Sequence, residues 1–130
     1  MIEFRLDSRS GVPTYLQLVQ QVRQAVRLGI LRPGDQLPTV KEVVTSLTIN
    51  PNTVLHAYRQ LDLEGLVEGK RGIGTFVAAA PPPPPVDDLK GLRSALERWV
   101  ARARTAGLDD ESIGALFADA VRPAGVSRVA

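Results

Sequence analysis

The chain has 130 residues, enough for one compact domain or for one small domain with an appendage. A hydrophobic fraction of 44% permits a packed core, and the absence of cysteine excludes disulfide frameworks, zinc–cysteine sites and thiol catalysis. A net charge of +2 is close to balance, so binding to nucleic acid would depend on where the charges lie. No segment approaches the ~20 apolar residues of a membrane span, and we expect a cytoplasmic chain with no membrane partner.

A run of prolines divides the chain. Residues 79–86 are expected to form a semi-rigid linker, because prolines cannot continue a helix or a central strand and favour polyproline II. We therefore expect a folded domain over residues 1–78, a helical element over 87–122 and a flexible tail over 123–130.

The N-terminal part of the chain predicts one helix and one short strand. Apolar residues at helical spacing run from Tyr15 to Val26, and Gly29 ends this pattern. Residues 31–35 have the composition of a turn, and residues 36–38 are a candidate short strand.

Two helices joined by a short turn are predicted next. Thr39 and Glu42 have the spacing of a capping box, so the earlier helix should start at Thr39. Residues 48–50 form the turn, in which Asn50 can cap the later helix and Pro51 suits its first position. The residues expected to be buried are Val43, Val44 and Leu47 in the earlier helix, and Val54, Ala57, Tyr58 and Leu61 in the later one.

A hairpin with a basic tip is predicted to follow. Residues 66–68 and 75–77 have strand character, and the glycine-flanked segment 69–74 between them carries Lys70 and Arg71. A phosphate loop would have to open a helix, which residues 75–77 cannot start, so these glycines do not indicate a nucleotide site. Helix, turn, helix and hairpin in this order predict a winged helix-turn-helix, a mainly α fold with a small β-wing that places its later helix in the major groove of DNA.

The later helix of this pair has a polar face suited to DNA. With its apolar residues turned inward, the opposite face carries Asn52, Thr53, His56, Arg59 and Gln60. Asparagine can pair with adenine, threonine offers a hydroxyl or a methyl group, and arginine can bind guanine or phosphate. His56 is the single histidine and has no His/Cys cluster with which to hold a metal. Since no nucleophile–base or carboxylate pair stands out, we expect neither an enzyme nor a cofactor.

Residues 87–122 predict two amphipathic helices, the first ended by Gly107 and the second capped by Asp109. Two helices of this size cannot bury all their apolar side chains against each other, so we expect a partner subunit to cover them. The expected dimerisation residues are Leu89, Leu92, Leu96, Trp99, Val100, Ile113, Leu116 and Phe117. No preformed small-molecule site is evident, although the dimer seam could form one for an unidentified effector, around Trp99 and Phe117.

Residues 13–77 closely resemble the DNA-binding domain of the GntR family of bacterial transcription regulators. The motifs that carry the resemblance are PGDQLP at 33–38, INPNTV at 49–54, EGLV at 64–67 and GIGTFV at 72–77. The short two-helix C-terminal part is similar to the YtrA subfamily. The resemblance implies a homodimeric repressor that binds a palindromic operator in double-stranded DNA, often at its own promoter or beside transporter genes.

The resemblance also implies, by position, which residues contact DNA. They are Lys41, Asn50, Asn52, Thr53, His56, Lys70, Arg71 and Gly72. Lys41 stands where the family usually has arginine and lacks its bidentate fork for guanine. The subfamily tends to have basic residues at the positions of His56 and Ile73, so we expect weaker DNA binding or a different site. The rival interpretation is a winged-helix protein-interaction module, since a fold does not determine a function.

Overall fold

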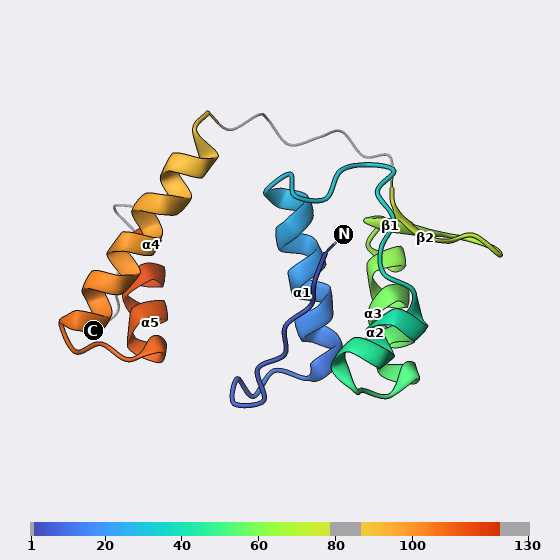
Figure 1. Cartoon of the computed structure of the whole chain (residues 1–130), viewed down its shortest axis with the longest axis horizontal. Coiled ribbons are helices and arrows are strands. Elements are labelled where there is room, and N and C mark those ends of the chain that lie inside the picture. The colour runs from blue at the N-terminus through green and yellow to red at the C-terminus, as the bar shows by residue number, and fades with distance from the viewer. Residues whose placement is uncertain (1, 79–86, 123–130) are drawn as a thin grey trace. The chain divides into compact units, whose positions relative to one another are not determined.

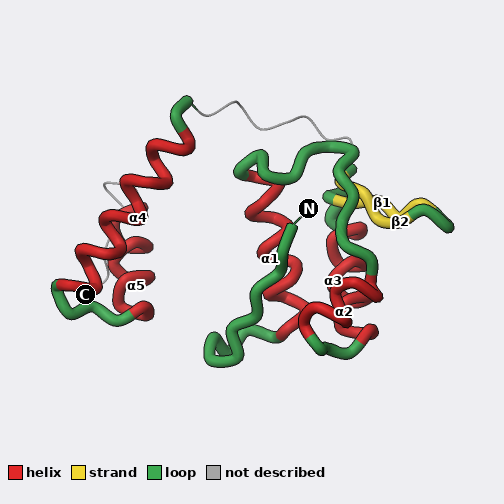
Figure 2. Tube along the Cα trace, in the orientation of Figure 1, coloured by secondary structure: helices red, strands yellow, loops and turns green. Residues whose placement is uncertain are grey.

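The computed structural model describes residues 2–78 and 87–122, which fall into two compact units, one within Met1–Pro85 and one within Val86–Ala130. The described residues are mainly helical and include one two-stranded antiparallel sheet (Figures 1 and 2). The elements in chain order are α1 (Thr14–Arg27), α2 (Val40–Leu47), α3 (Pro51–Leu63), β1 (Val67–Lys70), β2 (Gly74–Val77), α4 (Leu89–Thr105) and α5 (Asp110–Val121). The linker and the tail predicted at 79–86 and 123–130 lie outside the described residues. None of the described helices is long and apolar enough to cross a membrane.

Capping side chains define the start of α2 and of α3. The Thr39 hydroxyl oxygen accepts the N–H of Glu42 at 3.1 Å, and the Glu42 carboxylate accepts the N–H of Thr39 at 3.3 Å. The Asn50 side-chain oxygen accepts the N–H of Asn52 at 2.8 Å. Between these caps Thr48 adopts a left-handed conformation with φ 55°, which ends α2 and reverses the chain. The predicted capping box, turn and asparagine cap are therefore confirmed.

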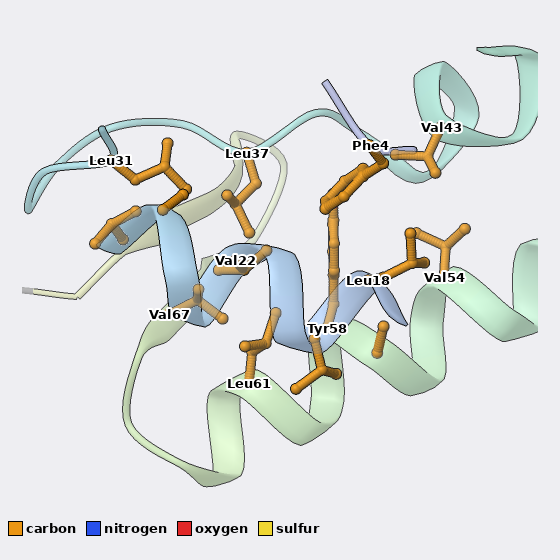
Figure 3. Close-up of a cluster of buried hydrophobic side chains, with 14 residues drawn as sticks. Phe4, Leu18, Val22, Leu31, Leu37, Val43, Val54, Tyr58, Leu61 and Val67 are labelled. Atoms are coloured by element: carbon orange, nitrogen blue, oxygen red, sulfur yellow. The ribbon is translucent and has the colours of Figure 1, made fainter. Parts of the chain in front are cut away.

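A buried apolar core holds the first unit together, with side chains from α1, α2, α3, both strands, the N-terminal segment and the loop before α2 (Figure 3). All four residues predicted to be buried on α3 are in this core, whereas on α2 Val43 is buried and Val44 and Leu47 are half-buried. The core residues are Phe4, Leu18, Val19, Val22, Ala25, Leu31, Leu37, Val43, Val54, Ala57, Tyr58, Leu61, Val67 and Val77. Complete burial of one leucine or valine stabilises a fold by about 1.5–3 kcal/mol, so this core fixes how α3 lies on α1.

Two polar ties reinforce the position of α3. At the C-terminal end of α3, both carboxylate oxygens of Glu64 accept hydrogen bonds from the guanidinium of Arg23 in α1, at 2.7 and 2.5 Å. This bonding lowers the pKa of the Glu64 carboxyl. Within the core, the Tyr58 hydroxyl donates to the backbone carbonyl of Pro38 at 2.5 Å, and burial raises the pKa of this hydroxyl. The second tie joins α3 to the segment that enters α2.

The wing is longer in its strands and shorter at its tip than predicted. The antiparallel pairing runs from Val67 opposite Val77 to Lys70 opposite Gly74, so the tip consists of residues 71–73. Lys70 therefore belongs to β1 and not to the tip. Its ammonium group lies 5.0 Å from the centroid of the Phe76 ring, a cation–π contact across the hairpin that favours the extended pairing.

The short strand predicted at residues 36–38 is not present in the described structure. Only Gln36 forms an isolated bridge, with Phe76 of β2. The Leu37 N–H donates to the Thr75 carbonyl at 2.8 Å, but Pro38 has no N–H with which to continue a ladder. The segment instead lies beside the wing and ties it to the core through the buried Leu37.

The second unit is an antiparallel pair of helices, α4 and α5 (Figure 1). Gly107, with φ 102°, lies in the turn between them. The Asp109 carboxylate caps α5 by accepting the N–H of Ser112 at 2.8 Å, and the hydrogen bonds from Ser112 lower the pKa of this carboxyl. Both features agree with the sequence prediction. Ala103 and Ile113 are the buried hydrophobic residues of the described part of this unit.

Candidate nucleic-acid interface

The outer face of α3 presents polar side chains, and no acidic residue of the same helix lies near them. Asn52, His56 and Arg59 are exposed, and Thr53 is half-buried. Asn52 and His56 share one face because residues four apart on a helix are neighbours. The first acidic residue of α3 is Asp62, near its C-terminal end. The leading half of α3 can therefore approach a polyanion with no carboxylate of its own in the way.

Asn50 has a structural role in addition to the DNA contact predicted for it. Its side-chain oxygen accepts the Asn52 N–H, and its backbone carbonyl accepts the Thr53 N–H at 3.0 Å. Pro51 has no N–H to offer. The first turn of α3 thus uses its backbone donors internally, so recognition at this end depends on side chains. The amide NH2 of Asn50 remains available for a ligand.

Three of the predicted DNA-contacting cations are exposed and form no ion pair within the described residues: Lys41 on α2, Arg59 on α3 and Arg71 at the wing tip. Their charge is therefore not neutralised by the protein. Lys70 is also exposed, but its ammonium group is held over Phe76. Exposed, unpaired cations are the groups that neutralise DNA phosphates, and here they lie on three successive elements of the helix-turn-helix and wing.

The wing tip depends on backbone geometry that favours glycine. Gly72 has φ 75°, and the Ile73 N–H donates to the Lys70 carbonyl at 2.9 Å to close the turn. The side chain of Gln36 reaches the tip and donates to the Ile73 carbonyl at 3.4 Å. A Cβ atom on Gly74 would lie 2.6 Å from the Nε2 atom of Gln36. Gln36 thus positions the wing, a role that sequence reasoning missed because no local pattern distinguishes this glutamine.

A second residue that sequence reasoning missed is Tyr15 of α1. Its ring stacks on the imidazole of His56, with centroids 3.8 Å apart and planes inclined by 14°. The sequence placed Tyr15 on the apolar stripe of the first helix, and it does pack partly against the core. Its additional contact with an exposed residue of α3 depends on how the two helices pack, for which the periodicity of either helix alone provides no signal.

Known proteins resemble this chain in sequence and in fold. The model of the family described as bacterial regulatory proteins, gntR family, matches residues 14–77. The HTH-type transcriptional repressor YtrA of Bacillus subtilis (strain 168) is 36% identical over 110 residues, which cover 84% of this chain and 85% of the relative. The solved structure of YtrA from Sulfolobus acidocaldarius, a GntR-family transcription factor, has a TM-score of 0.56 at 28% identity, over 75% of this chain and 97% of that one.

A solved complex with DNA shares the fold. The structure of AraR(DBD) in complex with operator ORE1 has a TM-score of 0.50 at 27% identity and covers 60% of this chain and 95% of that one. The predicted fold class and the predicted family are both confirmed. The chain belongs to the GntR family of bacterial regulatory proteins and is a DNA-binding transcriptional regulator.

Proposed function

We propose that the protein is a homodimeric repressor that binds a palindromic operator, at its own promoter or beside transporter genes. The observation that carries this proposal is the polar, acid-free leading half of α3, flanked by unpaired cations on α2 and on the wing. The similarity over most of the chain to YtrA, a transcriptional repressor, supports repression as opposed to activation. The rival is a winged-helix module that binds proteins and no specific DNA sequence.

In this proposal the side chains divide into base readers and phosphate binders. Asn52 and Thr53, on the first turn of α3, read base edges in the major groove, where each good contact discriminates by about 1–3 kcal/mol. Lys41 on α2 and Arg71 at the wing tip neutralise phosphates and so fix the position of α3 along the duplex. Arg59, farther along α3, adds a phosphate contact. The DNA partner is supported by the operator complex of the AraR neighbour.

The second unit supports the dimer. Much of the apolar surface of α4 and α5 is exposed, including Leu92 at 57%, Leu96 at 45% and Phe117 at 47%. Leu89, Trp99 and Val100 are half-buried, and Leu116 is exposed. Ile113 is already buried within the unit, so its role is to pack beneath the exposed apolar residues and not to contact the second copy directly. A second copy would cover this face by two-fold symmetry, and two DNA-binding units related in this way match a palindrome.

The DNA-binding proposal is tested by a gel-shift assay with the DNA upstream of the protein's own gene, at two salt concentrations. We expect a shifted band that survives excess unrelated DNA and weakens steeply with salt. Arg71→Ala should weaken binding to the upstream DNA and to the unrelated DNA alike. It should also make the affinity depend less steeply on salt, because it removes one phosphate contact. Gln24→Ala, an exposed position on α1, serves as a control. A protein-interaction module would give no band that resists the competitor.

The dimer is tested by sedimentation of the full chain at micromolar concentration. We expect a dimer for the wild type and a monomer for Leu96→Asp, because a carboxylate would be buried without a partner. Ser94→Asp places the same charge on the opposite, exposed face of α4 and should remain a dimer. A monomeric wild type, or a Leu96→Asp variant that stays dimeric, would count against this interface.

A further inference from the structure

Two aromatic rings from different helices stack beside the leading half of α3. Tyr15 is half-buried on α1, whereas His56 is exposed on α3. With a centroid separation of 3.8 Å and an angle of 14° between the planes, the rings are in face-to-face contact. A side chain held by the core therefore restrains an exposed one that would otherwise rotate freely.

The helices that carry the two rings are held in register. At their other end, Arg23 of α1 bonds both carboxylate oxygens of Glu64, just after α3. The same number of residues separates Tyr15 from Arg23 and His56 from Glu64, so the two helices run in the same direction with matched spacing. The stack thus belongs to a rigid pair of helices and not to a loop.

The stacked rings lie at the edge of a shallow hollow of about 420 Å³ on the side of α3 that bears the proposed DNA contacts. The residues that line it are Thr14, Tyr15, Asn50, Asn52, Thr53 and His56. They supply hydroxyl, amide and imidazole groups and no carboxylate. Such a lining can donate hydrogen bonds to phosphate oxygens and does not repel their charge.

We propose that the part of this hollow beside Thr14, Tyr15 and His56 binds a phosphate of the DNA backbone, next to the base-reading Asn52 and Thr53, and that Tyr15 is a positioning residue, whose ring holds the imidazole of His56 toward that phosphate. The inference rests on the proposed DNA-binding function and adds to it a residue outside the helix-turn-helix. A side chain already held in one rotamer loses less conformational entropy on binding than a free one. Loss of the stack therefore weakens DNA binding through His56.

The stack is tested by proton NMR of the full chain without DNA. His56 is the single histidine, so its two carbon-bound ring protons give one resonance each. Stacking on Tyr15 shifts both resonances upfield through the aromatic ring current. We expect Tyr15→Phe to keep this shift and Tyr15→Leu to lose it, since leucine keeps an apolar side chain against the core but has no ring. Identical His56 resonances in the wild type and in Tyr15→Leu would overturn the stack.

The functional coupling is tested by fluorescence anisotropy with the upstream DNA and with an unrelated duplex of equal length. His56→Ala should weaken the binding of both duplexes by a similar factor, as expected for a phosphate contact. Tyr15→Leu should weaken both by about twofold to tenfold, the range of one aromatic pair, and Tyr15→Phe by less than about twofold. The double variant Tyr15→Leu/His56→Ala should bind within about twofold of His56→Ala alone. Gln24→Ala, elsewhere on α1, should not change binding, and circular dichroism verifies the folding of every variant.

Three results would overturn the inference. If the two single losses multiply in the double variant, Tyr15 does not act through His56. If Tyr15→Phe binds as weakly as Tyr15→Leu, the hydroxyl is itself the contact. If His56→Ala weakens the upstream DNA alone, the hollow reads bases and not phosphate. A wild type that binds neither duplex would instead refute the proposed function, and the inference would fall with it.

Discussion

The substitution Tyr58→Phe removes one hydroxyl group and should weaken the attachment of α3 to the segment that enters α2. The Tyr58 hydroxyl donates at 2.5 Å to the carbonyl of Pro38, and both residues are buried. Phenylalanine keeps the packing but leaves that carbonyl without a partner, which should lower the free energy of unfolding by about 1–3 kcal/mol. For a domain of this size each kcal/mol corresponds to a fall of about 4–8 °C in Tm.

Urea unfolding near neutral pH, followed by circular dichroism, measures this loss. Burial raises the pKa of Tyr58, so its hydroxyl is protonated and can donate under these conditions. Tyr15→Phe is a matched control, because it deletes the same group where the described residues provide no hydrogen-bond partner for it; its stability should change by less than about 0.5 kcal/mol. A Tyr58→Phe variant as stable as the wild type would refute the argument.

Three further substitutions test the cap of α3, the backbone of the wing and the ion pair between α1 and Glu64. Asn50→Ala should lower the free energy of unfolding by about 0.5–2 kcal/mol, measured by urea unfolding, because α3 loses its cap. Gly74→Ala should destabilise the wing by about 1–3 kcal/mol, because φ there is +143°, whereas Gly69→Ala, with open space around it, should have a smaller effect. Bonding to Arg23 holds the pKa of Glu64 below its ordinary value of 4.5, so the stability it provides is present above that pH and is lost as the pH falls through the lowered pKa. Glu64→Gln should therefore show a smaller loss of urea midpoint than the wild type between about pH 6 and about pH 3.

The local signals in the sequence were sufficient for the helix-turn-helix. Thr39 with Glu42, and Asn50 before Pro51, mark helix starts through bonds between residues at most three apart, so their geometry is encoded locally. The buried face of α3 followed from its periodicity for the same reason. In the hairpin, the strand ends were less well predicted, because the pairing continues to Lys70 opposite Gly74, and Lys70 also contacts Phe76 on the other strand.

Contacts between elements could not be predicted from those signals. The stacking of Tyr15 on His56 and the hydrogen bond from Gln36 to the wing join residues 41 and 37 positions apart. Each depends on how α1 packs on α3, or on how the loop before α2 passes the wing. Only the assembled core determines either arrangement. The positioning residues Tyr15 and Gln36 were therefore missed. The exposed candidate contacts on α3 could be identified, because they lie on the helix face opposite its apolar residues.

The most direct test of the account is to select, from a pool of random duplexes, the sequences that the full-length protein binds. The account predicts that the wild type enriches a palindrome with two equivalent half-sites, and that Asn52→Ala or Thr53→Ala changes the preferred base at symmetric positions in both halves. Arg71→Ala should keep the same preferred sequence with lower affinity. Enrichment of no sequence, or preferences that these α3 variants leave unchanged, would contradict DNA reading by the leading half of α3.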